Sequence, residues 1–529
     1  MKAVSIFSNN SFENICIKEK RRNMNKKFVK GAAILTITTF LSKLLGSFFQ
    51  IPLQNIAGDE VLGIFRLVFP VYMIALTLSV AGVPLAISKL IAELNEKNKH
   101  KEIAKLFKSA SIIGMAFGIF GCLVIVLFST EIASMLGGEE TRVPLLVTSL
   151  ALLVAPYMAV YRGYFQGFGD MKPTGISQVI EQFVRVFFML IIACILVYWN
   201  ESSAIITSGA MVGSFLGVIS SLIYLRMTYN KSSYQYKSNS YSLQDLKKDG
   251  KKILQVSIPI AIGALSMPLL NLVDSLTVPH VLQGSSAEIQ AQFGIYSRGS
   301  AFTQLIVVFA SAIVFPLIPL LTSALAKKDM NLAKTTVQNT NSLMHVLTAP
   351  LTIWLIALTV PLNVGLFTDA KGSSMLAVMI GSSYFTSVMV LSIGVLQGIN
   401  RSAQAAWIVI GASFVKCLLN IVLTKKFGID GAAYSTLIIY VLICIINHLY
   451  IRKYLSYSVH IGRFFIVIGV SCILGLGLYE LSTIIDVTSS RIIALLYSGV
   501  ALAIAIILYA VCALKLNWIS KKQIPFLKK

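Results

Sequence analysis

The chain has 529 residues, of which 56% are hydrophobic and only 13% charged, and its mean hydropathy is +0.78. Soluble domains have about 45–50% apolar and about 25% charged residues, so this composition excludes a soluble globular protein and indicates an integral membrane protein. The formal net charge of +23 is spread over short segments between apolar runs. This distribution is typical of a membrane-topology signal and does not indicate a nucleic-acid partner.

Catalytic and metal-binding patterns are missing from the sequence. Six of the seven cysteines lie inside apolar runs, and the five histidines are scattered. No H-E-x-x-H motif and no phosphate-binding glycine loop occurs. The sequence therefore gives no support for an enzyme or for a metal site.

Residues 1–23 are polar and basic and lack the apolar core of a signal peptide. Met24, with the basic residues after it, would be a natural start for a membrane protein, so we expect a cytoplasmic N-terminal segment over 1–28 that includes an upstream extension. Fourteen apolar runs follow, each close to the roughly 20 residues that cross about 30 Å of hydrocarbon. Their expected ranges are 29–53, 65–91, 108–130, 143–165, 174–198, 203–227, 253–276, 295–322, 341–367, 375–398, 402–424, 430–451, 461–483 and 491–514. The sequence predicts an all-α integral membrane protein with fourteen transmembrane helices.

The loops predict the orientation of the chain. From Met24 on, loops on the side of the N-terminus hold 29 Lys and Arg residues, against 7 on the other side. Because cytoplasmic loops carry the excess of positive charge, we expect both termini in the cytoplasm. The longest loop, 230–252, has the composition of a flexible linker. It separates an N-lobe (29–229) from a C-lobe (253–453), which the last two spans (454–515) and a cytoplasmic tail (516–529) follow.

A polar helix face stands out at residues 162–185. Ser177, Glu181 and Arg185 recur every four residues, with Gln178 and Gln182 on the same face. A polar face inside a membrane span has to look into a protein interior or a watery cavity, which makes it a candidate functional site.

An internal repeat relates the two lobes at an offset of 231 residues. The matching segments are Gly163-x-x-Gln166-Gly167 with Gly394-x-x-Gln397-Gly398, Phe183-Val184-Arg185 with Phe414-Val415-Lys416, and Gly63-Ile64-Phe65 with Gly294-Ile295-Tyr296. An offset of six helices preserves orientation, so we expect two parallel-repeat six-helix lobes plus two C-terminal helices. Transporters built in this way bind substrate between the lobes and alternate access by rocking them.

Ionisable side chains inside the spans or at their mouths leave a surplus of three positive charges. They are Lys43, Arg185, Lys416, Glu181 and Asp274 within spans, and Arg66 and Arg298 at the outer mouths of spans 2 and 8. Each charge at mid-bilayer costs about 2.5–3.5 kcal/mol, so these residues need a function or a partner. A cationic cavity favours an anion, and guanidinium forks with lysine point charges fit a diphosphate.

Two pairs of these residues also have a structural interpretation. Glu181 and Arg185 lie four residues apart and would neutralise each other as an ion pair that holds span 5. Lys416 shares a helix face with Asn420, and it is a candidate for an ion pair with Asp274, across spans 11 and 7.

Four segments resemble a known superfamily: YRGYFQGFGDMKPTGISQVIEQFVRV (161–186), SIPIAIGALSMPLLNLVDSL (257–276), VLQGINRSAQAAWIVIGASFVKCLLN (395–420) and FGIDGAAYST (427–436). They resemble the polysaccharide-transporter branch of the multidrug/oligosaccharidyl-lipid/polysaccharide (MOP) exporters, in particular the stage V sporulation protein B group and the MurJ lipid II flippases. The resemblance covers residues 24–520. It implies a bacterial plasma-membrane exporter of an undecaprenyl-diphosphate-linked saccharide, with a cationic cavity between its lobes and a lipid-tail groove at the last two spans.

The resemblance also implies roles for single residues. Lys43 matches an essential arginine of span 1, and Arg298 matches a cavity arginine of span 8. Some MurJ proteins bind sodium through an aspartate of span 7 and an asparagine and an aspartate of span 11. Asp274 matches the first, but Lys416 and Asn420 stand at the other two positions. We therefore expect no cofactor and no sodium coupling, with the Lys416 ammonium in the place of the ion.

Three other functions stay open at this stage. A cation-coupled drug antiporter of the same superfamily would need acidic groups, and only Glu181 and Asp274 qualify. A teichoic-acid or capsule precursor presents the same diphosphate as lipid II. A non-transporting scaffold would have cell-wall synthases as its partners, and the buried cations argue against it.

Overall fold

The computed structural model describes residues 31, 34–80, 82–236, 240–455 and 461–515, and these residues form helices and their connections. The expected N-terminal segment (1–28) and tail (516–529) lie outside the described residues. A first helix covers residues 34–48. The remaining elements of the first half are α2 (Gln50–Val80), α3 (Val83–Glu96), α4 (His100–Leu127), α5 (Ser129–Met135), η1 (Glu139–Thr141), α6 (Arg142–Gly167), α7 (Lys172–Tyr198) and α8 (Ser203–Asn230). Those of the second half are α9 (Leu243–Ala264), α10 (Ser266–Val281), α11 (Ser286–Ala326), α12 (Met330–Ala357), α13 (Thr359–Phe367), α14 (Ser373–Gly398), α15 (Ser402–Tyr454), α16 (Ile461–Ile484) and α17 (Arg491–Lys515).

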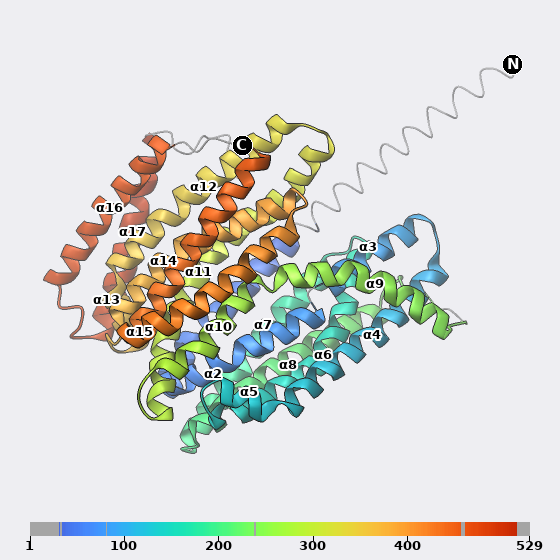
Figure 1. Ribbon diagram of the computed structural model, residues 1–529, viewed down its shortest axis with the longest axis horizontal. Helices are drawn as coiled ribbons and strands as arrows, with labels where there is room; N and C mark the ends of the chain where they lie inside the picture. Colours follow the sequence, from blue (N-terminus) through green and yellow to red (C-terminus); the bar gives the residue numbers. More distant parts are fainter. Residues whose placement is uncertain (1–30, 32–33, 81, 237–239, 456–460, 516–529) are drawn as a thin grey trace.

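The helices gather in two groups (Figure 1). In one group α2, α4, α6, α7 and α8 pack on one another, and in the other α11, α12, α14 and α15 do so. Helix α16 packs on α12 and α17 on α13, at the edge of the second group. Helix α2 contacts α10 and α11, so the two groups meet along it.

Two long helices double back on themselves. Gly58 in α2 and Gly428 in α15 have non-helical backbone with positive φ, a conformation that glycine adopts without steric cost. The rings of Phe49 and Phe65 lie 5.2 Å apart, although 16 residues of straight helix would span about 24 Å. In the same way the Lys416 Nζ lies 6.0 Å from the ring of Tyr440. The chain therefore reverses direction at Gly58 and at Gly428.

The expected number of fourteen spans is not confirmed by the count of helices. Among the described residues, 11 helices are long and apolar enough to cross a membrane, or 12 if the bent pair α9 and α10 is one span. The difference arises because Ile34–Glu96 and Ser402–Tyr454 each count once, although each contains a reversal. The all-α, multi-pass membrane architecture is confirmed.

The seventh predicted span, 253–276, is a broken helix. Helices α9 and α10 meet at Leu265 with a bend of 52°. Pro268 follows in the first turn of α10, where its missing N–H removes a hydrogen bond that a continuous helix would need. Helix α9 also begins earlier than expected, inside the 230–252 linker, because Ser242 and Asp245 form a reciprocal N-terminal capping box. Part of that linker is thus helical and not flexible.

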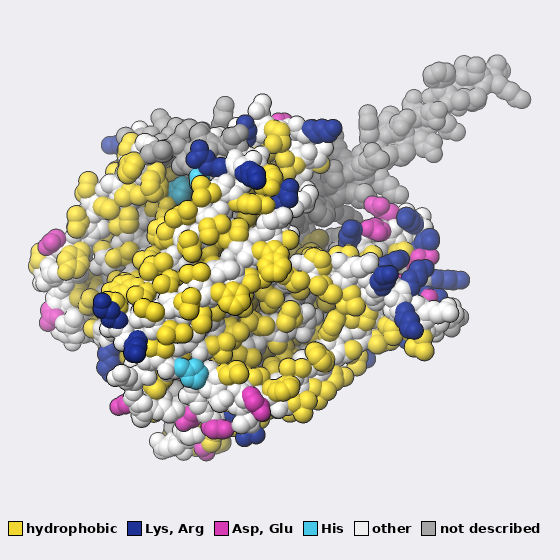
Figure 2. Space-filling model, viewed as in Figure 1, with side chains coloured by type: hydrophobic (Ala, Val, Ile, Leu, Met, Phe, Trp, Pro, Cys, Tyr) yellow, Lys and Arg dark blue, Asp and Glu magenta, His cyan; other side chains and the backbone are white. Residues whose placement is uncertain are grey.

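The surface between the two ends of the molecule is apolar (Figure 2). Hydrophobic side chains cover most of the visible face, and charged side chains gather toward its ends. Side chains such as Phe120, Leu127, Phe414 and Ile473 are more than half exposed. In water such a surface would aggregate, so it is the surface that faces lipid.

A row of small residues sets the position of α7, which carries the polar face. Gly209, Gly213 and Gly217 recur every four residues on α8, and a Cβ atom added at Gly217 would lie 2.6 Å from the backbone oxygen of Glu181. Small residues at this spacing let two membrane helices approach closely. The close approach fixes the height and rotation of Glu181 and Arg185.

We expect Gly217→Val to destabilise the protein, because the added carbons must push α7 away. Overpacking of this kind costs about 1–3 kcal/mol, and thermal unfolding in detergent measures it. The matched control is Gly477→Val, since no atom lies within 4 Å of a Cβ at that position. Equal melting temperatures for the two variants would contradict this account of the α7–α8 contact.

Candidate functional site: a cationic cavity between the lobes

A cavity of about 520 Å³ lies between the two groups of helices. Its walls come from the first helix, α2, α6, α7, α10 and α11. The charged residues that line it are Lys43, Arg66, Arg162, Arg185 and Glu181. Four cations and one carboxylate give this cavity a net charge of +3.

Glu181 binds two of these cations. Its Oε1 accepts a hydrogen bond from Arg185 at 2.7 Å, and its Oε2 accepts one from Arg162 at 2.7 Å. The Nε of Arg162 also donates to Ser177, at 2.9 Å. The predicted Glu181–Arg185 pair is confirmed, but it is half of a three-member cluster with one positive charge in excess.

Lys43 and Arg66 also line the cavity. The Lys43 Nζ donates to Ser311 of α11 at 3.3 Å, so it reaches across to the other lobe. The Arg66 carbonyl accepts a hydrogen bond from Ser275 at 3.3 Å, and its guanidinium forms no hydrogen bond or ion pair with any residue that the structure describes. The prediction that Arg66 stands at an outer mouth is wrong, because the reversal at Gly58 places it in the cavity wall.

Uncharged polar groups complete the wall. Thr39, Ser42, Gln178, Gln182 and Gln304 line the cavity. Two buried atoms of the polar face, Gln182 Oε1 and Arg185 Nε, have no hydrogen-bond partner among the described residues. Unpaired buried polar atoms are costly, so these two are available to a polar ligand.

A second buried ionic group lies beside the cavity. The Asp274 carboxylate of α10 accepts hydrogen bonds from Lys416 Nζ at 2.7 Å and from Asn420 at 2.9 Å. Lys416 is fully buried and also donates to the Leu270 carbonyl, at 3.2 Å. The ion pair considered between Lys416 and Asp274 is confirmed. As a consequence Lys416 does not line the main cavity, whereas Asp274 borders a smaller space of about 80 Å³ that it shares with Arg66.

The residues around Asp274 do not fit a sodium ion. Both carboxylate oxygens are engaged, Oδ2 by Lys416 and Oδ1 by Asn420. The Lys416 ammonium also takes the Leu270 carbonyl, an oxygen that a hard cation would use. We interpret Lys416 as a built-in cation at this position.

This interpretation predicts a gain of sodium dependence in Lys416→Asn. The substitution leaves the Asp274 carboxylate with neutral oxygen and amide neighbours, so a small cation should compensate its charge. Transport measured with sodium and with choline as the external cation should then differ in the variant and agree in the wild type. A variant that transports at full rate in both media would contradict the interpretation.

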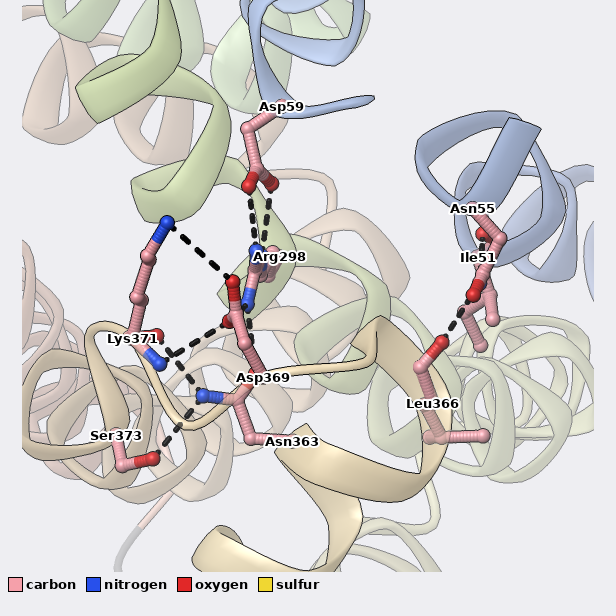
Figure 3. Close-up of polar contacts among 9 residues, drawn as sticks. All are labelled: Ile51, Asn55, Asp59, Arg298, Asn363, Leu366, Asp369, Lys371 and Ser373. Carbon is pink, nitrogen blue, oxygen red and sulfur yellow. Dashed lines mark hydrogen bonds and ion pairs between the residues drawn. The ribbon is translucent and has the colours of Figure 1, made fainter. Parts of the chain in front are cut away.

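Arg298 lies elsewhere, contrary to the prediction of a cavity arginine. It is 0% exposed and lines neither of the two spaces described above. Its guanidinium bonds Asp59 at 2.9 and 2.5 Å, Asp369 at 2.6 Å and Asn363 at 3.1 Å (Figure 3). Two carboxylates already satisfy its charge, so Arg298 is not one of the cations that face the cavity.

Arg298 changes the pKa of Asp369, which lies in the connection after α13. Burial alone would raise the pKa of this carboxyl, but the hydrogen bond and charge of Arg298 outweigh it and hold the pKa below its ordinary value. A depressed pKa means that the ionised form persists at every pH above about 3.9, the ordinary value for aspartate. Its contribution to stability is lost only as the pH falls through the lower pKa of the folded state.

Arg162 is the cavity residue that the sequence analysis missed. Its charge was counted with the loop that follows the predicted span 143–165, because it lies near the end of that span. The helix continues to Gly167, which places Arg162 one and a half turns inside it. The signal was present in Ser177 and Glu181, since a polar face on α7 needs polar partners on the adjacent helix.

Membrane-length helices arranged in two lobes around a buried polar cavity are the architecture of a membrane transporter. Residues 28–325 match the polysaccharide biosynthesis protein family. The uncharacterized membrane protein YabM of Bacillus subtilis (strain 168) is 34% identical over 416 residues, which are 77% of this chain and 76% of YabM. The lipid II flippase MurJ of the same organism is 25% identical over 94% of this chain and 97% of MurJ.

A solved structure, of lipid II flippase MurJ in an inward closed conformation, has the same fold. It superposes with a TM-score of 0.67 and 15% identity, over 92% of this chain and 100% of that chain. The chain belongs to the polysaccharide biosynthesis protein family of the MOP superfamily. It is a transporter and not an enzyme. The family predicted from the four sequence segments is confirmed.

Proposed function

We propose that this chain moves a polyprenyl-diphosphate-linked saccharide, with lipid II as the first candidate, from the inner to the outer leaflet of the bacterial plasma membrane. The observation that carries the proposal is the cavity between the lobes, where four cations meet one carboxylate. A diphosphate fits this arrangement because guanidinium groups bind phosphate oxygens in pairs and a lysine adds a point charge. The polyprenyl tail would stay in the lipid, near α16 and α17.

The relatives support this cargo class. The MurJ relative that covers nearly the whole chain is named a lipid II flippase. At 25% identity this name does not transfer the saccharide to the present chain, and the 34% identical relative is called uncharacterized. Teichoic-acid and capsule precursors, which present the same diphosphate, therefore belong in the test.

The transport route follows from the topology that we propose. If each reversal, at Gly58 and at Gly428, separates two spans and the bent pair α9 and α10 is one span, the chain crosses the membrane fourteen times. Both termini then lie in the cytoplasm, as the excess of Lys and Arg predicts. The N-lobe is 29–229 and the C-lobe 253–453, with spans 13 and 14 in 454–515. The headgroup enters the cavity from the inner leaflet and leaves after the lobes rock.

The membrane potential would favour this direction of transport. Moving one elementary charge through 100 mV changes its energy by about 2.3 kcal/mol. With the cell interior negative, the potential expels an anion. No coupling ion is needed for that contribution, in agreement with the occupied Asp274 position.

A cation-coupled drug antiporter is not supported by the site. It would need a carboxylate that is free to exchange a proton or a sodium ion for the drug. Glu181 is held by Arg162 and Arg185, and Asp274 by Lys416 and Asn420. Both carboxylates of the two spaces are thus already neutralised.

The proposal is tested by rescue of a strain depleted of its lipid II flippases. Expression of this chain should restore growth, and mass spectrometry of the lipid fraction should show that the accumulated precursor falls to its normal level. A dye-efflux assay in an efflux-deficient host is the counter-test for the antiporter. Restored dye efflux without any change in diphosphate-linked lipids would overturn the proposal.

A further inference from the structure

We propose that Arg298 is the centre of a latch that holds the lobes together at the end of the molecule next to α13. The latch consists of Arg298, Asp59, Asp369 and Asn363 (Figure 3). In this latch Asp59 is the partner that leaves when the lobes separate, and Asp369 is the partner that stays. The inference deepens the proposed function, since it rests on alternating access of the same cavity.

The first arm of the latch joins the two lobes. Asp59 follows the reversal at Gly58, in the first lobe, and Arg298 belongs to α11, in the second. The Arg298 Nε donates to Asp59 Oδ1 at 2.9 Å, and the Nη2 donates to Oδ2 at 2.5 Å. Two parallel bonds of this kind make a strong and directional contact.

The second arm stays within one lobe. The Arg298 Nη1 donates to Asp369 at 2.6 Å and to the Asn363 side chain at 3.1 Å. Asn363 is itself fixed, because its amide donates to the Lys371 carbonyl at 2.9 Å and to Ser373 at 3.0 Å. These residues lie on α13, on α14 and in their connection, and both α11 and α13 pack on α14. Arg298 and Asp369 would therefore move together.

The burial of Arg298 explains why two arms are needed. The side chain is 0% exposed, and an unpaired buried charge is strongly unfavourable. If Asp59 were its only carboxylate partner, separation of the lobes would leave the guanidinium without a counter-charge. Asp369 removes most of that penalty, so the contact with Asp59 can open and close.

The neighbouring contacts show that this is where the lobes close. Gly63 of α2 and Gly294 of α11, which the sequence repeat relates to each other, meet here, and a Cβ at Gly63 would lie 3.0 Å from the Gly294 nitrogen. The Asn55 side chain also donates to the Leu366 carbonyl, at 2.7 Å (Figure 3). Opening the cavity at this end has to break all of these contacts along with the Asp59 bonds.

The two carboxylates are therefore expected to act in opposite directions. Asp59→Asn weakens the closed state only, because Arg298 still has Asp369 in the open state. Asp369→Asn weakens the open state more than the closed state, because only the closed state keeps a carboxylate on Arg298. A merely structural role would make both substitutions act alike.

The experiment measures access to the cavity from outside. The full-length chain, with its native cysteines replaced by alanine, carries Gln304→Cys in the cavity wall as a reporter. Intact cells are treated with a maleimide that does not cross the membrane, and the labelling rate is divided by the total thiol after denaturation. We expect Asp59→Asn to raise the rate about tenfold, the effect of one charge-assisted hydrogen bond, and Asp369→Asn to lower it. Equal changes in one direction, or no change for Asp59→Asn, would overturn the latch.

A second variant covers the case in which Asp59→Asn does not fold. Asn55→Ala removes the adjacent bond to the Leu366 carbonyl and leaves every charge of the latch paired. It should raise labelling about threefold, by loss of a neutral hydrogen bond, and an unchanged rate would count against closure at this end. The readout needs no cargo, so opposite effects in a chain that moves no diphosphate lipid would uphold the latch and reject the proposed function.

Discussion

Arg66→Ala should lower the rate of diphosphate-lipid translocation at least about tenfold, because a hydrogen bond to a charged group contributes about 1.5–3 kcal/mol. Lys43→Ala should have an effect of the same size. Both side chains line the cavity, and Lys43 also donates to the hydroxyl of Ser311. Among the described residues, no carboxylate forms an ion pair with Arg66. Removal of the Arg66 side chain therefore leaves no ion-pair partner without its counter-charge, so folding and expression of Arg66→Ala should be retained.

The comparison of a charge-retaining variant with a matched control sharpens this prediction. Arg66→Lys keeps the charge but loses the planar fork, and should fall between wild type and Arg66→Ala. Lys89→Ala is the control, since Lys89 is an exposed cation of α3 that does not line the cavity. Translocation by Lys43→Ala and Arg66→Ala at the wild-type rate, in protein that is present at normal levels, would show that the cavity cations do not bind the cargo.

Lys416→Met should unfold the protein at a much lower temperature than wild type. Removal of one partner from a buried ion pair leaves an uncompensated charge and costs about 3–5 kcal/mol. Asp274→Leu should be destabilising for the same reason. The double variant should regain most of the loss, because replacing both partners of a buried pair by apolar groups is often neutral or stabilising.

Thermal unfolding of the four proteins in one detergent gives the coupling between the two sites. If the melting temperature of the double variant falls by the sum of the two single decreases, Lys416 and Asp274 act independently. That result would contradict the 2.7 Å contact between them. The result also separates stability from transport. Partial recovery of stability without recovery of transport would assign the pair a role in the transport cycle.

Local sequence patterns predicted the ion pairs but not the three-dimensional neighbourhood of each charge. Glu181 and Arg185 lie four residues apart on one helix, so their pairing follows from helix geometry alone. The Lys416–Asp274 pair could be considered because both an acid and a base lie inside spans of the C-lobe. By contrast, Asp59 and Arg298 are 239 residues apart in the chain. Nothing in either local sequence indicates that they meet.

The prediction of the fold from the sequence was limited in the same way, at a few glycines and one proline. Hydropathy located the apolar runs, but the bend at Leu265 depends on how Pro268 and the packing of α10 divide one run into two helices. The end of α6 was placed at residue 165 and not at Gly167, and the charge of Arg162 was assigned to the loop that follows. Both errors concern positions where tertiary contacts decide the length of a helix, and hydropathy does not report such contacts.

The central claim is that the cavity binds the diphosphate of a lipid-linked saccharide, and reconstitution tests it most directly. Purified wild-type protein and Arg66→Ala are placed in liposomes that contain a fluorescent polyprenyl-diphosphate saccharide, and a membrane-impermeant quencher reports the fraction that has crossed. We predict that wild-type protein moves the diphosphate lipid much faster than a neutral polyprenyl glycoside, and that Arg66→Ala moves the diphosphate lipid at least about tenfold more slowly than wild type. Equal transfer of both lipids, or equal rates for the two proteins, would contradict the account.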